Sequence, residues 1–127
     1  MIEVLVEGDV TGEVVLLDSP LSFWGGYDPV EGVIIDRSHP QVGVSLAGKV
    51  TVMAHGRGSS SSSAVLTEAL RLGTGPAAIV LAEADQIVVT GALGARLLYE
   101  VECPVVVGEI IEPGTWRVSG DGMERVG

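Results

Sequence analysis

The chain has 127 residues and a formal net charge of −10 at pH 7, a length that suits one domain and is too short for two. A surface this acidic repels phosphate backbones and anionic lipids, which argues against binding to nucleic acid or to a membrane. Hydrophobic residues make up 46% of the chain, so it can form a packed core and does not have the composition of a disordered protein.

Cys103 is the single cysteine of the sequence. One cysteine forms no internal disulfide, and it cannot hold an iron–sulfur cluster, which needs several thiolates. The N-terminal sequence shows no signal-peptide pattern, and no apolar stretch reaches the roughly 20 residues that span a bilayer. We therefore expect a cytoplasmic protein.

In the first half of the chain, the apolar residues follow strand patterns that are separated by turns. Strands are predicted over residues 2–7, 13–17, 33–36 and 49–54. The segment 18–32 is rich in glycine and proline, so no regular element is predicted there. The loop 37–48 separates the last two strands.

The second half interleaves helices with strands. Helices are predicted over residues 64–72 and 92–99, and strands over residues 77–82, 87–90, 105–107 and 115–119. No internal repeat or linker is visible. The pattern predicts an α/β fold, a single domain over residues 1–127 with two main helices and a mixed rather than a purely parallel sheet.

The most unusual segment is the run Gly56-Arg57-Gly58 followed by five serines, Ser59 to Ser63. Gly/Ser tracts are commonly flexible linkers, but here a strand enters the run and a helix leaves it. The free amides and the dipole at a helix start favour anions. We therefore interpret residues 56–63 as an anion-binding or active-site loop, in which one serine caps the helix.

Two further groups are weaker candidates. Asp36 and His39 bracket a loop and could exchange protons, although such residues more often form turns. Phe23, Trp24 and Tyr27 suit either a contact with another surface or the core. No spacing of histidines and the one cysteine indicates a metal site.

Several motifs, in the same order along the chain, resemble the small subunits of aconitase X-type dehydratases. The matching segments are residues 22–29 (SFWGGYDP), 32–36 (GVIID), 39–40 (HP), 46–49 (LAGK), 56–61 (GRGSSS), 91–92 (GA), 98–99 (LY) and 103–106 (CPVV). They extend over nearly the whole chain, which makes the resemblance far more specific than the serine run alone.

The resemblance implies a swivelling β/β/α domain like the mobile domain of aconitase. It also implies a heterodimer whose large subunit carries an iron–sulfur cluster as Lewis acid, while this chain binds no cofactor. The implied reaction is the dehydration of a small anionic or hydroxy-acid substrate. Ser59 matches the proton-accepting serine, and Gly56, Arg57, Gly58, Ser60 and Ser61 would then bind the substrate.

Two substrates fit the resemblance. Mevalonate 5-phosphate, which would give trans-anhydromevalonate 5-phosphate in isoprenoid biosynthesis by a mevalonate pathway, is the first expectation, and cis-3-hydroxy-L-proline is the alternative. A different class of function also fits the residues: a non-catalytic swivel module that binds a small anion by itself, in which Ser59 would be replaceable.

Overall fold

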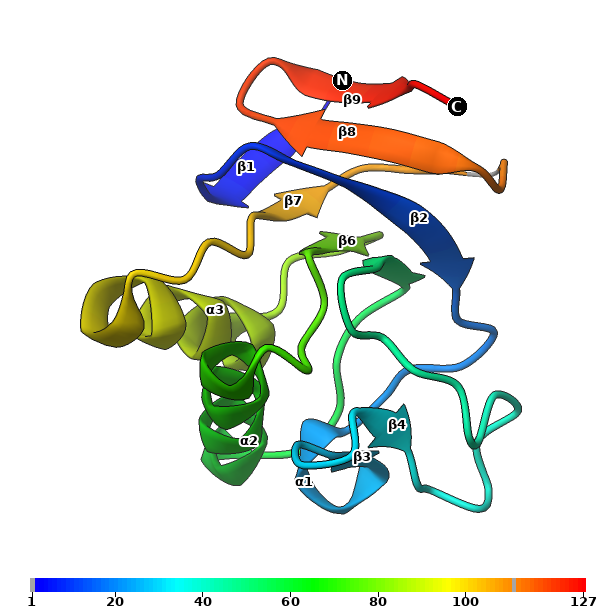
Figure 1. The fold of residues 1–127 in the computed structure, drawn as a ribbon, viewed down its shortest axis with the longest axis vertical. Helices are drawn as coiled ribbons and strands as arrows, with labels where there is room; N and C mark the ends of the chain where they lie inside the picture. The colour runs from blue at the N-terminus through cyan, green and yellow to red at the C-terminus, as the bar shows by residue number, and fades with distance from the viewer. Residues whose placement is uncertain (1, 111) are drawn as a thin grey trace.

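The computed structural model describes residues 2–110 and 112–127, and within them seven strands form one curled sheet in the order β1-β7-β6-β5-β2-β8-β9 (Figure 1). The neighbours β2, β5, β6 and β7 run parallel, whereas β1, β8 and β9 add antiparallel strands at the two edges. The predicted mixed sheet is therefore confirmed. The strands are β1 (Glu3–Val6), β2 (Val10–Leu16), β5 (Val50–Met53), β6 (Ala78–Leu81), β7 (Val105–Val107), β8 (Thr115–Ser119) and β9 (Gly122–Arg125).

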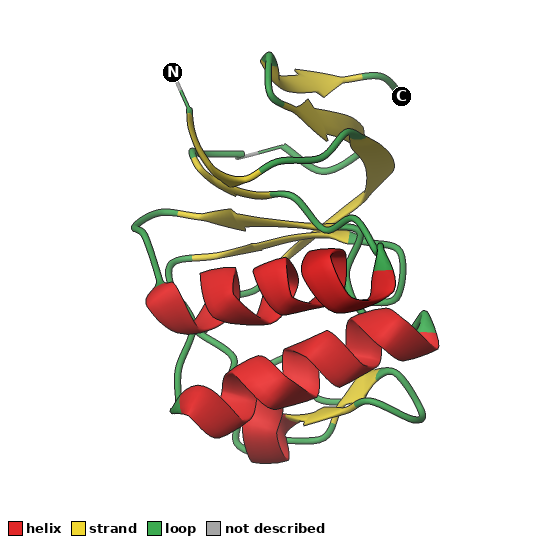
Figure 2. Cartoon of the chain, turned by 90° about the vertical axis from the view of Figure 1, so that its left-hand side faces the viewer, coloured by secondary structure: helices red, strands yellow, loops and turns green. Residues whose placement is uncertain are grey.

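Two helices pack side by side on one face of this sheet (Figure 2). Helix α2 (Ser60–Leu72) joins β5 to β6, and α3 (Gln86–Tyr99) joins β6 to β7. The helices approach closely at Gly91, where an added Cβ would lie 2.9 Å from both Leu66 Cδ2 and the carbonyl oxygen of Ser63. Any larger residue at position 91 would push the helices apart.

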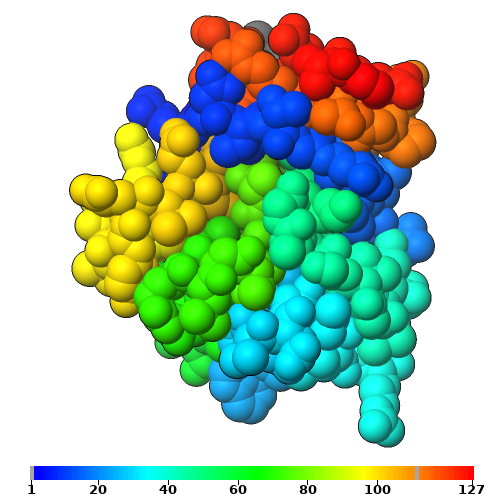
Figure 3. Space-filling view, in the orientation of Figure 1, coloured from blue at the N-terminus to red at the C-terminus, as the bar shows by residue number. Residues whose placement is uncertain are grey.

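A small subdomain lies beside the N-terminal end of α2. It consists of a four-residue helical turn, α1 (Phe23–Gly26), and a two-stranded ribbon of β3 (Tyr27–Asp28) and β4 (Val33–Ile34). In the space-filling view, the light-blue segment with α1 and the green segment of α2 abut at the end of the molecule opposite β9 (Figure 3).

The hydrophobic core has two layers, one on each face of the sheet. Strand β6 shows this arrangement, because its four residues are fully buried but point alternately to opposite sides. Ile79 and Leu81 join the layer under the helices, whereas Ala78 and Val80 join the layer enclosed by the curled strands. This double burial explains the uninterrupted apolar run over residues 77–82.

Three sequence-based element predictions need correction. Residues 87–90 were expected to be a strand, and they belong to α3. Helix α2 begins at Ser60, four positions before the predicted start at residue 64. Strand β2 begins at Val10 rather than at residue 13. Sequence patterns predicted neither β9 nor the short elements α1 and β3, which lie within residues 18–32.

Within residues 2–110 and 112–127, none of the helices combines the length and apolar character needed to cross a bilayer.

Candidate functional site: the serine loop

Residues 56–61, here called the serine loop, connect β5 to the N-terminus of α2. Ser59 is the N-cap of α2: its backbone is extended, and its side chain accepts a hydrogen bond from the Ser61 amide at 3.4 Å. A serine hydroxyl in this position satisfies one of the free amides at the helix start. The predicted capping serine is thus Ser59, and the run is the ordered first turn of a helix rather than a linker.

The five serines fall into two groups. Ser59, Ser60 and Ser61 are exposed. Ser62 and Ser63 are buried, with relative exposures of 1% and 6%, and their hydroxyls are committed to the protein. Ser62 Oγ accepts a hydrogen bond from the Trp24 amide at 3.2 Å, and Ser63 Oγ donates to the Ile87 carbonyl at 2.8 Å. Only the first three hydroxyls are therefore free to meet a ligand.

Gly58 gives the loop a shape that other residues would not adopt. Its φ of +103° lies in a region disfavoured for side-chain-bearing residues. An added Cβ would collide with Ser62 Oγ and lie 2.7 Å from Ser22 Oγ. At Gly58 the backbone lies close to the hydroxyls of Ser62 and Ser22, and the chain turns sharply there just before Ser59.

The start of the loop is fixed by Asp85, the N-cap of α3. Asp85 Oδ2 accepts a hydrogen bond from the buried Gly56 amide at 3.0 Å, while Oδ1 accepts one from the Val88 amide at 3.1 Å. One carboxylate thus caps α3 and holds the serine loop. Sequence reasoning missed Asp85, although an aspartate just before an apolar helical run is a recognisable cap signal.

Arg57 is exposed, and its backbone amide donates to the Leu21 carbonyl at 3.2 Å. Among the residues that the structure describes, its guanidinium forms no ion pair. Arg57 thus offers a positive charge two positions before Ser59 in the sequence of a protein whose net charge is −10. Such a guanidinium can bind a carboxylate or phosphate with paired hydrogen bonds.

Asp36 and His39 have different surroundings. Hydrogen bonds from the Ser38 hydroxyl and amide lower the pKa of Asp36, with a smaller contribution from the charge of Arg57. These contacts do not test the predicted role of Asp36 in the site, which stays a prediction.

His39 is buried, with a relative exposure of 5%. Its Nδ1 accepts from the Gln41 amide at 3.0 Å, so the proton sits on Nε2, which donates to the Ser19 carbonyl at 2.9 Å. Both ring nitrogens therefore hold loop backbone together. The structure assigns His39 a role in packing and leaves no ring nitrogen free for proton transfer.

The residues of this chain do not fit an iron–sulfur cluster. Cys103 is fully buried, and burial raises the pKa of its thiol to about 12, so it remains a protonated thiol at neutral pH. Elsewhere in the described part of the chain, no group of three or more His, Cys, Asp and Glu side chains is placed to hold a metal ion.

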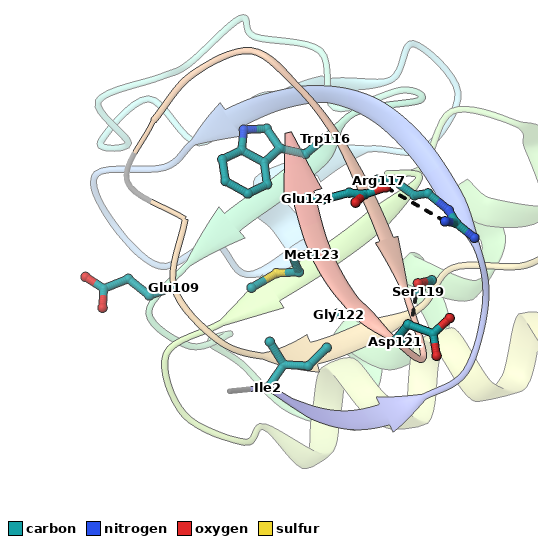
Figure 4. A pocket seen from close by; sticks show the side chains of 9 residues that line it. All are labelled: Ile2, Glu109, Trp116, Arg117, Ser119, Asp121, Gly122, Met123 and Glu124. Carbon is teal, nitrogen blue, oxygen red and sulfur yellow. Dashed lines mark hydrogen bonds and ion pairs between the residues drawn. The ribbon is translucent and has the colours of Figure 1, made fainter. Parts of the chain in front are cut away.

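Two cavities within the described residues lie away from the serine loop. One, of about 580 Å³, lies against β8 and β9 with Trp116, Arg117 and Asp121 among its lining residues (Figure 4). The other, of about 510 Å³, lies between α2 and α3. Residues 57–61 are exposed and form an open rim on the surface at the start of α2.

The curled mixed sheet, the two helices on one face and the open serine rim at the start of α2 define a swivel domain of the aconitase type. The holo-form crystal structure of Thermococcus kodakaraensis aconitase X superposes with a TM-score of 0.85 at 33% identity, covering 98% of this chain and 95% of that chain. The family model of the aconitase X swivel domain matches residues 1–122, and the chain belongs to this family. The predicted fold class is thereby confirmed.

Two relatives differ in how much of their length is matched. The phosphomevalonate dehydratase small subunit of Pyrococcus furiosus is 38% identical over 104 residues, which cover 82% of this chain and 73% of that protein. The cis-3-hydroxy-L-proline dehydratase of Pseudomonas aeruginosa is 43% identical over 101 residues, covering 80% of this chain. The matched region spans only 17% of that longer protein.

Proposed function

We propose that this chain is the small subunit of a two-subunit aconitase X-type hydro-lyase and that mevalonate 5-phosphate is its substrate. The observation that carries the proposal is the exposed Ser59 at the N-cap of α2, two positions after the exposed Arg57. The coverage of the relatives supports the small-subunit assignment, because the match takes up most of the P. furiosus small subunit and one segment of the P. aeruginosa enzyme.

In the proposed reaction, Ser59 Oγ accepts a proton from one substrate carbon while the hydroxyl group leaves the neighbouring carbon. A serine hydroxyl is a weak base, so its alkoxide needs stabilisation. The Ser61 amide already points to Ser59 Oγ, and the positive end of the α2 dipole lies at the same place. Arg57 adds a full positive charge. Together these groups favour the alkoxide and an anionic substrate.

The open position of the serine loop supports the requirement for a second subunit. Residues 57–61 are exposed in this chain, so we assign the opposite wall of the site and the exclusion of water to another polypeptide. We assign the iron–sulfur cluster implied by the resemblance to that large subunit, since Cys103 is buried and protonated.

The test is co-expression with a cysteine-bearing large subunit, followed by turnover assays on mevalonate 5-phosphate and on cis-3-hydroxy-L-proline. We expect the complex to dehydrate mevalonate 5-phosphate and the isolated chain to show negligible turnover. Turnover by the chain alone would overturn the proposal, and preferential turnover of cis-3-hydroxy-L-proline would replace the substrate.

The competing function, a non-catalytic anion-binding module, predicts a different result. Such a module would bind inorganic phosphate without any partner, and replacing Ser59 would leave the activity of the complex unchanged. Phosphate titration of the isolated chain by calorimetry, together with turnover of a Ser59→Asn complex, distinguishes the two functions.

A further inference from the structure

The three clustered aromatic residues of the small subdomain differ in burial. Phe23 and Tyr27 are buried, with relative exposures of 2% each, and their rings meet edge to face at 5.7 Å. Trp24 lies between them in sequence but is 64% exposed. The core thus takes two of the aromatics and leaves the largest one in solvent, an arrangement that hydrophobic burial within this chain does not explain.

The backbone of Trp24 is held rigidly although its side chain is exposed. The Trp24 amide donates to Ser62 Oγ at 3.2 Å, and the Trp24 carbonyl accepts from Ser22 Oγ at 3.0 Å. Ser62 belongs to the first turn of α2, which also begins with Ser59. The turn that carries the indole is therefore hydrogen-bonded to the first turn of α2, which begins at the proposed proton acceptor.

The surface around Trp24 is open and partly apolar. Gly25 has empty space on its exposed side, with no atom within 4 Å of the position of a Cβ. Ile35 is 46% exposed, and its amide donates to the Gly26 carbonyl at 2.8 Å, which places it next to this turn. We call Trp24, Gly25 and Ile35 the Trp24 patch.

We propose that the Trp24 patch is the docking surface for the large subunit and that the Trp24 indole is the anchor of the interface. This inference rests on the proposed function, because the polypeptide that closes the serine loop has to approach the first turn of α2, to which the Trp24 turn is hydrogen-bonded. A rigid backbone presenting an exposed tryptophan is the usual form of an interface hot spot, since little entropy is lost on binding. The large subunit accordingly supplies an apolar pocket for the indole beside its active site.

Helix α3 offers a second exposed apolar surface and therefore the matched control. Leu97 and Leu98 are 73% and 70% exposed near the C-terminal end of α3, whereas the Trp24 patch adjoins the N-terminal end of α2 (Figure 1). Replacing Leu97 tests whether loss of any exposed apolar side chain weakens assembly.

The experiment measures the dissociation constant between this chain and the large subunit by calorimetry. We expect Trp24→Ala to raise Kd by at least about 30-fold, as loss of a hot-spot aromatic does, with kcat at saturating small subunit close to wild type. Leu97→Ala should change Kd by less than about 3-fold. The inference would be overturned if Trp24→Ala left Kd unchanged, or if Leu97→Ala raised Kd more than Trp24→Ala did.

A second measurement does not depend on a substitution. The chain contains two tryptophans, Trp24 and Trp116, so labelling it with 5-fluorotryptophan gives one fluorine resonance for each. On addition of the unlabelled large subunit, we expect the Trp24 resonance to shift and that of Trp116, beside β9, to stay. A shift of Trp24 on concentrating the chain alone would indicate a second copy as the occupant and overturn the inference. Failure of the wild-type chain to bind the large subunit would instead refute the proposed function itself.

Discussion

Ser22 and Ser62 lie 40 positions apart in sequence, yet their Oγ atoms are 3.0 Å from each other. Because Ser22 Oγ donates to the Trp24 carbonyl, the proton between the two serines comes from Ser62, and Ser62 Oγ in turn accepts from the Trp24 amide. The three hydrogen bonds close a ring in which each hydroxyl both donates and accepts. The ring joins α1 to α2 directly behind Ser59.

Because Ser59 is exposed and Ser62 is buried, we expect replacing Ser59 to lower activity and replacing Ser62 to lower stability. Ser59→Asn keeps a side chain that caps a helix but has no hydroxyl to ionise, so kcat of the complex should fall at least about 100-fold with little change in Tm. Ser62→Ala opens the ring behind the loop and should lower the free energy of unfolding by about 1–3 kcal/mol. Its kcat, measured well below its Tm, should stay within several-fold of wild type.

Thermal melts and turnover measurements on the same preparations check this pair. Ser59→Ala serves as the reference, since it removes the cap and the hydroxyl together and should cost about 1 kcal/mol of stability besides its activity. Equal losses of kcat for Ser59→Asn and Ser62→Ala would mean that the proton acceptor is not Ser59.

Asp85→Asn should loosen the serine loop. Asparagine keeps one oxygen acceptor, whereas Asp85 uses two, one for the Val88 cap and one for the buried Gly56 amide. We expect a loss of about 1–2 kcal/mol in the free energy of unfolding. Hydrogen exchange of the Gly56 amide should become at least about 10-fold faster. The matched control is Asp18→Asn, an exposed aspartate in the loop after β2, for which neither quantity should change.

Tyr27 joins the small subdomain to the end of α2 and should be important for stability. Its hydroxyl donates to the Thr74 carbonyl at 2.7 Å and accepts from the Leu46 amide at 3.2 Å. Tyr27→Phe removes both bonds and should lower the free energy of unfolding by about 1–3 kcal/mol. Tyr99→Phe, at an exposed tyrosine, should stay within about 0.5 kcal/mol of wild type in the same urea titration.

Cys103 should make stability fall at alkaline pH. Burial raises the pKa of its thiol from 9.0 to about 12. Between these values the unfolded chain releases the thiol proton and the folded chain keeps it, so unfolding becomes more favourable as pH rises. The expected slope is about −1.4 kcal/mol per pH unit.

The alkaline slope is tested against Cys103→Ala, because all other titrating groups are common to both proteins. Urea unfolding from about pH 8 to about pH 11 should show wild type losing stability faster than the variant. Parallel curves for the two proteins would mean that the thiol is not held protonated by the fold.

Sequence patterns predicted the elements whose burial follows a simple period. Residues 77–82 read as a strand because both faces of β6 are buried, and the helical face of α2 was visible from Leu66 onward. The serine turn was missed as helix because serines carry no apolar period, and its stability comes from hydrogen bonds to Ser22, Trp24 and Ile87 in other segments.

The misassigned segment 87–90 shows a local preference overridden by packing. Ile87, Val88 and Val89 favour a strand on their own. The Asp85 cap before them and the small residues after them allow a helix to pack tightly against α2, and this tertiary contact decides the outcome. The orientation of the serine loop was likewise beyond sequence patterns, because it depends on φ at Gly58 and on the distant partner Asp85.

The pairing of β1 with β7 constrains the order of events during synthesis. Glu3 lies opposite Val107 in this ladder, so β1 leaves the ribosome before β2, β5 and β6 and waits for β7, which is synthesised after them. Pairing between segments so far apart in sequence is slow, and one side of β7 stays unpaired until β1 docks against it. A nascent chain stalled before residue 105 would therefore expose a sheet edge that is open to pairing with other polypeptides.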